Sequence, residues 1–179
     1  MSNAIVVGDG PGGLSAALLL AKNGVDVEVF GTDDTPMYKA MLLNYLGIPK
    51  MTGSDFQKVS REQVEDFGAT LHKVRVDDVE KADGKFQIHT ADGDAHQADY
   101  LVLATTNKAH QESLGIERED GTAAVNRDGR TSVENCYAIG WASRNHKIQA
   151  IISAGDGAAA AIDILSKEKG EPFHDFDFV

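Results

Sequence analysis

Two short apolar runs, with a glycine-rich turn and a helical segment between them, fill the first 30 residues. The first run spans residues 3–7, and the turn that follows it, residues 8–13, reads GDGPGG. Residues 14–24 then carry leucine and alanine at helical spacing and end on a glycine, a common helix terminator. The second run spans residues 25–30. This order predicts a strand–turn–helix–strand unit, the building block of a parallel sheet.

The turn satisfies the G-x-G-x-x-G pattern with Gly8, Gly10 and Gly13. In this pattern the first glycine permits the tight turn, the second lets the backbone approach a pyrophosphate, and the third lets helix and sheet pack closely. The helix that follows offers free N–H groups and a positive dipole end to phosphates. Pro11 removes one donor but fixes φ where the helix begins. The motif predicts a dinucleotide-type site, and a turn that serves only packing is the alternative.

The acid that binds ribose in such sites stands at the end of the second strand. Here Gly31 occupies that place, and Asp33 and Asp34 follow it. Either carboxylate could accept hydrogen bonds from ribose hydroxyls, and both would repel a 2′-phosphate. Solvated loop charges are the alternative interpretation.

The rest of the chain predicts one α/β domain over residues 1–179, with a parallel sheet and a three-stranded antiparallel meander. Ser54 and Gln57 have the spacing of a capping box, so a helix is expected to begin at Ser54. Alternating strands follow this helix, with Asp-Gly turn signals at 83–84 and 92–93, and they read as the meander. Buried strands are expected at 100–104 and 136–139 and an alanine-rich helix at 149–165, and residues 107–130 are polar and glycine-rich.

Composition excludes several classes of protein. With 28 acidic and 17 basic residues the net charge is −11, which repels nucleic-acid backbones. No apolar run approaches the ~20 residues that cross a membrane, and no secretory signal is visible, so a cytoplasmic protein is expected. The single cysteine, Cys136, excludes a C-x-x-C pair and is expected to be a small core residue.

The six histidines show neither H-x-H nor H-E-x-x-H spacing, so no metal site is expected. His146 is the one histidine expected near the glycine-turn site. It lies in the loop before the alanine-rich helix.

The order of these motifs resembles the flavin-binding domain of thioredoxin reductase, in the two-dinucleotide-binding-domain flavoprotein superfamily. The likeness rests on VVGDGPGGLSAALLLAKNG, NYLGIPKMTGSDF, REQVEDFGATL, ADYLVLAT, RTSVENCYAIG and IQAIISAGDGAAAA, in the family's order. It implies that the first turn holds the pyrophosphate of FAD and that the last helix points its N-terminus at the flavin. The predicted cofactor-binding residues are Gly8, Gly10, Pro11, Gly12, Gly13, Gly31, Asp33, Asn44, Ala104, Thr105, Thr106, Gly140, Trp141, Gln149 and Ala150.

The chain departs from that family in four places. Only residues 107–130 lie where thioredoxin reductases insert an NADPH-binding domain with its redox cysteine pair. The family's Gly-Gly-Gln turn after the second strand is missing. Thr106 replaces the last glycine of an Ala-Thr-Gly motif. Trp141 replaces the aspartate that accepts a hydrogen bond from the flavin's ribityl chain, and an indole can only donate.

These observations predict a stand-alone FAD-binding oxidoreductase module that uses an external electron donor and does not reduce thioredoxin with NADPH by itself. A non-catalytic flavin or dinucleotide binder, acting as a sensor or a complex subunit, is the alternative, and NAD in the same cleft is a third possibility. Residues 171–179 form an aromatic and acidic tail with three phenylalanines. The tail is expected to dock on the chain's own sheet or on a second subunit, which would give a homodimer.

Overall fold

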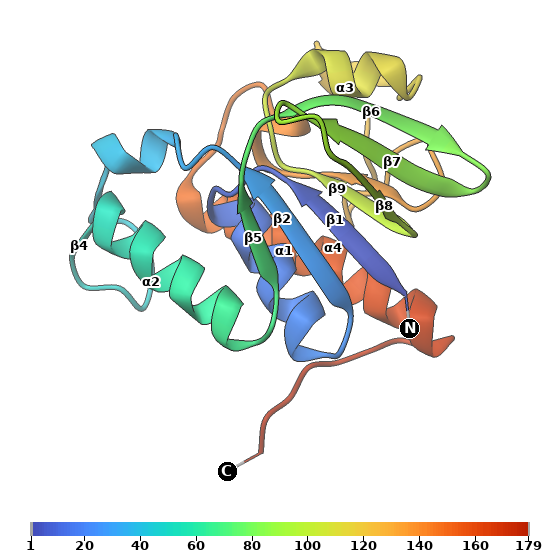
Figure 1. Ribbon diagram of the computed structural model, residues 1–179. Helices are drawn as coiled ribbons and strands as arrows, with labels where there is room; N and C mark the ends of the chain where they lie inside the picture. The colour runs from blue at the N-terminus through green and yellow to red at the C-terminus, as the bar shows by residue number, and fades with distance from the viewer. Residues whose placement is uncertain (1, 179) are drawn as a thin grey trace.

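Five parallel strands form the centre of the molecule, in the spatial order β12-β9-β1-β2-β5 (Figure 1). The computed structural model describes residues 2–178. The strands are β1 (Asn3–Val7), β2 (Asp26–Gly31), β5 (Thr70–Lys73), β9 (Tyr100–Leu103) and β12 (Cys136–Ala138). The chain leaves β1 for β2 on one side and returns to β9 on the other, so their carboxyl ends meet at a switch point in strand order.

Helices α1 (Pro11–Lys22) and α4 (Ala150–Lys169) pack against each other on one face of this sheet (Figure 1). Every second residue of β1, Ala4 and Val6, is buried against them. The two helices approach closely because glycines face each other, and a Cβ on Gly157 would lie 2.1 Å from the carbonyl oxygen of Gly12. The closeness brings the N-termini of both helices to the same end of the sheet.

The predicted meander covers the opposite face, and its existence is confirmed. It consists of β6 (Val76–Ala82), β7 (Lys85–Thr90) and β8 (Ala95–Ala98), paired in that order. Its inward residues, such as Phe86 and Ile88, are fully buried against alternate residues of the parallel sheet. The molecule therefore has three layers: helices, parallel sheet and meander.

The remaining elements are short. The polar, glycine-rich residues 107–130 contain a helix and two paired strands. The short elements of the whole chain are β3 (Met41–Leu42), β4 (Met51–Thr52), α3 (Lys108–Ser113), β10 (Arg118–Glu119), β11 (Thr122–Ala123) and the 3₁₀ helices Pro36–Lys39 and Gly140–Ala142.

Helix α2 (Gly53–Asp66) begins differently from the expected capping box. Thr52 is its N-cap: the Thr52 hydroxyl accepts a hydrogen bond from the Asp55 N–H at 3.1 Å and donates one to the Asp55 carboxylate at 2.7 Å. Gln57, the expected partner of Ser54, is fully buried, and its side-chain amide donates to the backbone carbonyl of Asp9. The prediction is wrong because Gln57 contacts a residue 48 positions away.

The tail after α4 docks in part. Phe173 packs against the helix-side core, and Lys22 forms ion pairs with Asp175 at 3.0 Å and with Asp177 at 2.6 Å. The side chains of Phe176 and Phe178 are 72% and 94% exposed. Residue 179 of the predicted tail lies outside the described residues. Over residues 2–178, no helix combines the length and apolar character that a membrane crossing requires.

Candidate cofactor-binding site

Packing explains three glycines of the first turn. Gly8 has a φ of +116°, and a Cβ there would lie 2.5 Å from the carbonyl oxygen of Ala104. A Cβ on Gly13 would lie 1.9 Å from the carbonyl oxygen of Gly8, and one on Gly12 would lie 3.0 Å from that of Ser153. The fold therefore requires glycine at positions 8 and 13, and helix α4 leaves little room for a side chain at Gly12.

Gly10 is different. Its φ of −81° suits any residue, and a Cβ built on it would meet only the Thr35 hydroxyl, at 3.7 Å. The fold therefore does not require glycine at this position. A side chain there would instead project into open space beside the turn.

That space is a cavity of about 680 Å³ at the carboxyl ends of β1, β2 and β9, a size and a place typical of small-molecule sites in open α/β sheets. Most of the residues that the sequence singled out line it: Gly8, Gly10, Pro11, Gly12, Gly31, Ala104, Thr105, Thr106, Gly140, Trp141, Gln149 and Ala150. The sequence motifs thus lie together around one cavity.

The two helices that begin at the cavity lack side-chain caps. Gly10, which precedes α1, has no side chain to act as a cap, and the side chain of Gln149 does not cap α4. By contrast, Thr52 caps α2 and Asn107 caps α3. Uncapped N-termini leave backbone N–H groups free and present the positive ends of two helix dipoles. The cavity is thus prepared for negative charge at two separate points.

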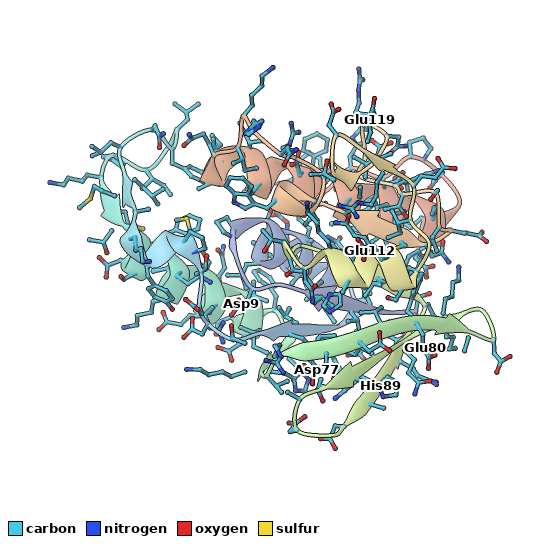
Figure 2. All side chains as sticks on the ribbon, turned by 90° about the horizontal axis from the view of Figure 1, so that it is seen from above. Asp9, Asp77, Glu80, His89, Glu112 and Glu119 are labelled. Atoms are coloured by element: carbon cyan, nitrogen blue, oxygen red, sulfur yellow. The ribbon has the colours of Figure 1, made fainter. Side chains whose placement is uncertain are left out.

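Asp9 places a carboxylate at the end of β2, where the sequence has Gly31. A Cβ on Gly31 would lie 2.4 Å from the nearer Asp9 carboxylate oxygen, so this carboxylate occupies the side-chain space at the end of β2. It accepts the N–H of Asp33 at 3.1 Å and pairs with Arg61 of α2 at 2.6 Å. Figure 2 shows Asp9 beside this helix. Sequence reasoning missed Asp9 and Arg61, although Asp9 stands inside the motif.

Three predicted site residues do not line the cavity. Gly13 lies beneath it in the helix–strand contact. Asp33 turns to Arg61 and Lys73, at 3.8 and 3.9 Å, and Asp34 lines the cavity in its place.

Asn44 is exposed, but it contacts a residue that lines the cavity. Its amide donates to the side-chain oxygen of Gln149 at 3.0 Å. Asn44 therefore reaches the cavity only through its hydrogen bond to Gln149, at the start of α4.

Trp141 lies at the mouth of the cavity, with 47% of its surface exposed. The indole therefore does not fill the space that a cofactor would need. Asp156, one acid of this neighbourhood, is engaged elsewhere: it accepts the Gly140 N–H at 3.3 Å and pairs with Arg144 at 2.7 Å.

A histidine does face the cavity, but it is His110 and not His146. His146 is exposed and does not line the pocket, whereas His110 is buried in α3 and does. Its Nε2 lies 3.0 Å from the side-chain amide of Asn107. Burial lowers the pKa of His110. His110 is therefore neutral near pH 7.

A second polar cluster lies outside the cavity. Glu28, His72 and His96 each offer one ligand atom, and these three atoms lie within 4.8 Å of one another. The expectation of no metal site rested on spacing along the chain, and such spacing does not reveal a cluster whose residues come from three strands.

The fold and the cavity together define a Rossmann-like α/β domain with a glycine turn at a strand switch point. A family model, the pyridine nucleotide-disulphide oxidoreductases, matches residues 2–106 and 43–158. The chain belongs to this family, and its resemblance to thioredoxin reductases is confirmed.

Relatives and solved structures agree with this assignment. The chain is 26% identical to a dihydrolipoyl dehydrogenase of Halobacterium salinarum, over 88% of this chain and 35% of that protein. It is 25% identical to a thioredoxin reductase of Spironucleus barkhanus, over 90% of this chain and 52% of that protein. An atypical thioredoxin reductase from Desulfovibrio vulgaris Hildenborough superposes with a TM-score of 0.86 at 19% identity, over 97% of this chain and 100% of that one. The chain thus spans about half or less of the length of the dihydrolipoyl dehydrogenase and of the Spironucleus thioredoxin reductase.

Proposed function

We propose that the chain binds FAD in this cavity and acts as a flavin-dependent oxidoreductase module with separate electron donors and acceptors. The observation that carries the proposal is Gly10. Packing requires glycine at Gly8 and Gly13, whereas Gly10 borders the cavity and no packing contact among the described residues requires a glycine there. A glycine kept where the protein leaves room for a side chain suits a ligand that approaches the backbone.

The residues around the cavity fit FAD along its length. The backbone at Gly10 and the uncapped start of α1 would hold the pyrophosphate. Asp34, on the same side of the cavity as the buried Asp9 carboxylate, suits ribose hydroxyls. Thr105, Trp141 and the start of α4 would hold the flavin ring. When bound, FAD would supply one- or two-electron transfer.

The chain's own contribution is electrostatic and steric. The free N–H groups and positive dipole end of α4 stabilise negative charge at that end of the cavity. Val7, Met37 and Ile139 give the cavity apolar walls, which exclude water and strengthen these interactions. His110 adds a neutral imidazole to the wall.

Within this chain no thiol can relay electrons from the cavity. Cys136 is the only cysteine; it is buried in β12, and burial raises the pKa of its thiol to about 12. A thiol with that pKa stays protonated and unreactive near neutral pH. Electrons would therefore pass directly between the flavin and another protein or a diffusing donor.

The test is the visible absorption spectrum of the purified full chain and the identity of the nucleotide that heat releases from it. We expect a yellow protein that releases FAD. Gly10→Val should abolish flavin binding without lowering the melting temperature of the flavin-free protein, because a Cβ at Gly10 meets only one atom within 4 Å. Gly155→Val is the matched control, since a Cβ at Gly155 meets nothing within 4 Å and this residue lies outside the cavity.

Unchanged flavin content in the Gly10→Val protein would refute the site. A colourless wild-type protein that FAD cannot reconstitute would instead support a non-catalytic dinucleotide binder.

A further inference from the structure

Three ligand-type side chains converge at the edge of the parallel sheet, outside the cofactor cavity. Nε2 of His72 lies 2.7 Å from Oε2 of Glu28, and Nδ1 of His96 lies 3.0 Å from the same oxygen. Glu28 comes from β2, His72 from β5 and His96 from β8. Two imidazole nitrogens from different sheets therefore point at one carboxylate oxygen.

Strand register explains the convergence. In the parallel sheet Phe30 pairs with His72, and Glu28 lies two residues before Phe30 on the same face. That face is the one that the meander covers, and β8 of the meander brings His96 against it. The cluster is thus built on three strands and does not depend on a loop.

Phe30 holds both imidazole rings in orientation. Its ring stacks on His72 at 4.4 Å with an interplanar angle of 7°, and it meets His96 at 4.7 Å and 66°. Phe30 itself is 1% exposed. A fixed ring limits the rotamers of its neighbours, so the two nitrogens are held close to their converging positions.

The charge of Glu28 lacks a permanent partner. Over the described residues 2–178, its ion pairs are with His72 and His96 alone, and no lysine or arginine pairs with it. The three side chains remain 28%, 28% and 22% exposed, so an ion and water can reach them. A divalent cation would neutralise the carboxylate and use both imidazole lone pairs.

We propose that Glu28, His72 and His96 bind one divalent transition-metal ion of the zinc class. Two histidines and one carboxylate form a recurrent ligand set for such ions, with water completing the coordination. Bonds of about 2.0–2.1 Å in a tetrahedral site place ligand atoms about 3.3 Å apart, so the two short contacts need to open by only a few tenths of an ångström. The bound ion would join the parallel sheet to the meander.

The test is calorimetric titration of the chelator-treated full chain with zinc chloride. We expect one zinc ion per chain, and Glu28→Gln, His72→Gln and His96→Gln should each weaken binding at least about tenfold. His89→Gln is the matched control: Figure 2 shows His89 with Glu80 on the meander, where the two lie 3.5 Å apart and outside the cluster. This variant should bind zinc as the wild type does.

A measurement on the wild-type chain guards against variants that fail to fold. In a histidine-selective NMR spectrum, zinc should shift the signals of two of the six histidines, His72 and His96, and leave His89 unchanged. Zinc should also raise the melting temperature of the wild type but not of the Glu28→Gln protein. Absence of binding, or equal binding by a variant with all three residues replaced, would overturn the proposal.

Discussion

Trp141 stands where the resemblance to thioredoxin reductases implies an aspartate. The indole stands at the mouth of the cavity and offers no acceptor to a ribityl chain. Trp141→Asp should therefore tighten FAD binding, since one hydrogen bond to a charged group contributes about 1.5–3 kcal/mol. Fluorescence titration with FAD measures this change.

The same titration tests whether the indole contacts the flavin. An indole against the ring quenches flavin emission by donating an electron, so Trp141→Phe should brighten bound FAD. Unchanged brightness and affinity in both variants would remove Trp141 from the site.

His110 should make the free energy of unfolding depend on pH. Because burial lowers its pKa, the unfolded chain binds a proton at this position below about pH 6.5 while the folded chain does not. The free energy of unfolding should therefore fall as the pH drops from 7.5 to 5.5, by up to about 1.4 kcal/mol per pH unit from this group. The carboxylates of Asp77 and Asp78, which raise the pKa, reduce the effect.

Urea unfolding at pH 7.5 and pH 5.5 measures the fall in the free energy of unfolding. The comparison is between the wild type and His110→Gln, which carries no titratable group at this position. The variant should lose less stability between the two pH values. Equal losses would show that His110 titrates alike in the folded and unfolded chains.

At the scale of elements, the tail divides into a docked part and an exposed part. Phe173 packs on the core, whereas Phe178 is 94% exposed. Phe173→Ala should therefore lower the free energy of unfolding by about 1–2 kcal/mol, and Phe178→Ala should change it by less than about 0.5 kcal/mol. Thermal unfolding compares the two. Equal effects would mean that the docking of Phe173 does not hold in solution.

The sequence predicted the elements better than it predicted the contacts between them. The strand of residues 3–7, the meander and the glycine turn follow from local periodicity and turn residues, and the structure contains all three. The cap of α2, the pairing of Asp9 with Arg61 and the position of His110 were missed. The cap depends on a choice between neighbouring polar residues, Thr52 and Ser54. The other two features depend on packing between distant segments, since Asp9 and Arg61 are 52 positions apart.

The metal-type cluster could not be predicted for the same reason. Its histidines lie 44 and 68 positions from Glu28, and only the strand order and register bring them together. A search for spacing along the chain finds ligands on one helix or one strand, so it cannot find a cluster that three strands share.

At the scale of the whole molecule, the described residues 2–178 form the cavity beside Gly10, and the sequence holds a single cysteine, which is buried. We therefore expect this chain, with FAD bound, to show no turnover when NADPH and thioredoxin are its only partners. An assay of NADPH oxidation at 340 nm checks this, with an artificial electron donor as the positive control for a competent flavin. Measurable reduction of thioredoxin by NADPH would contradict the proposed separation of donor and acceptor from this chain.

The central claim is that the cavity beside Gly10 takes FAD. Calorimetric titration of the flavin-free full chain with FAD, and in parallel with NAD, tests it most directly. We predict one FAD bound per chain and at least about tenfold weaker binding of NAD, because the cavity wall formed by Thr105, Trp141 and α4 suits a flavin ring. Absence of FAD binding, or tighter binding of NAD than of FAD, would contradict the account.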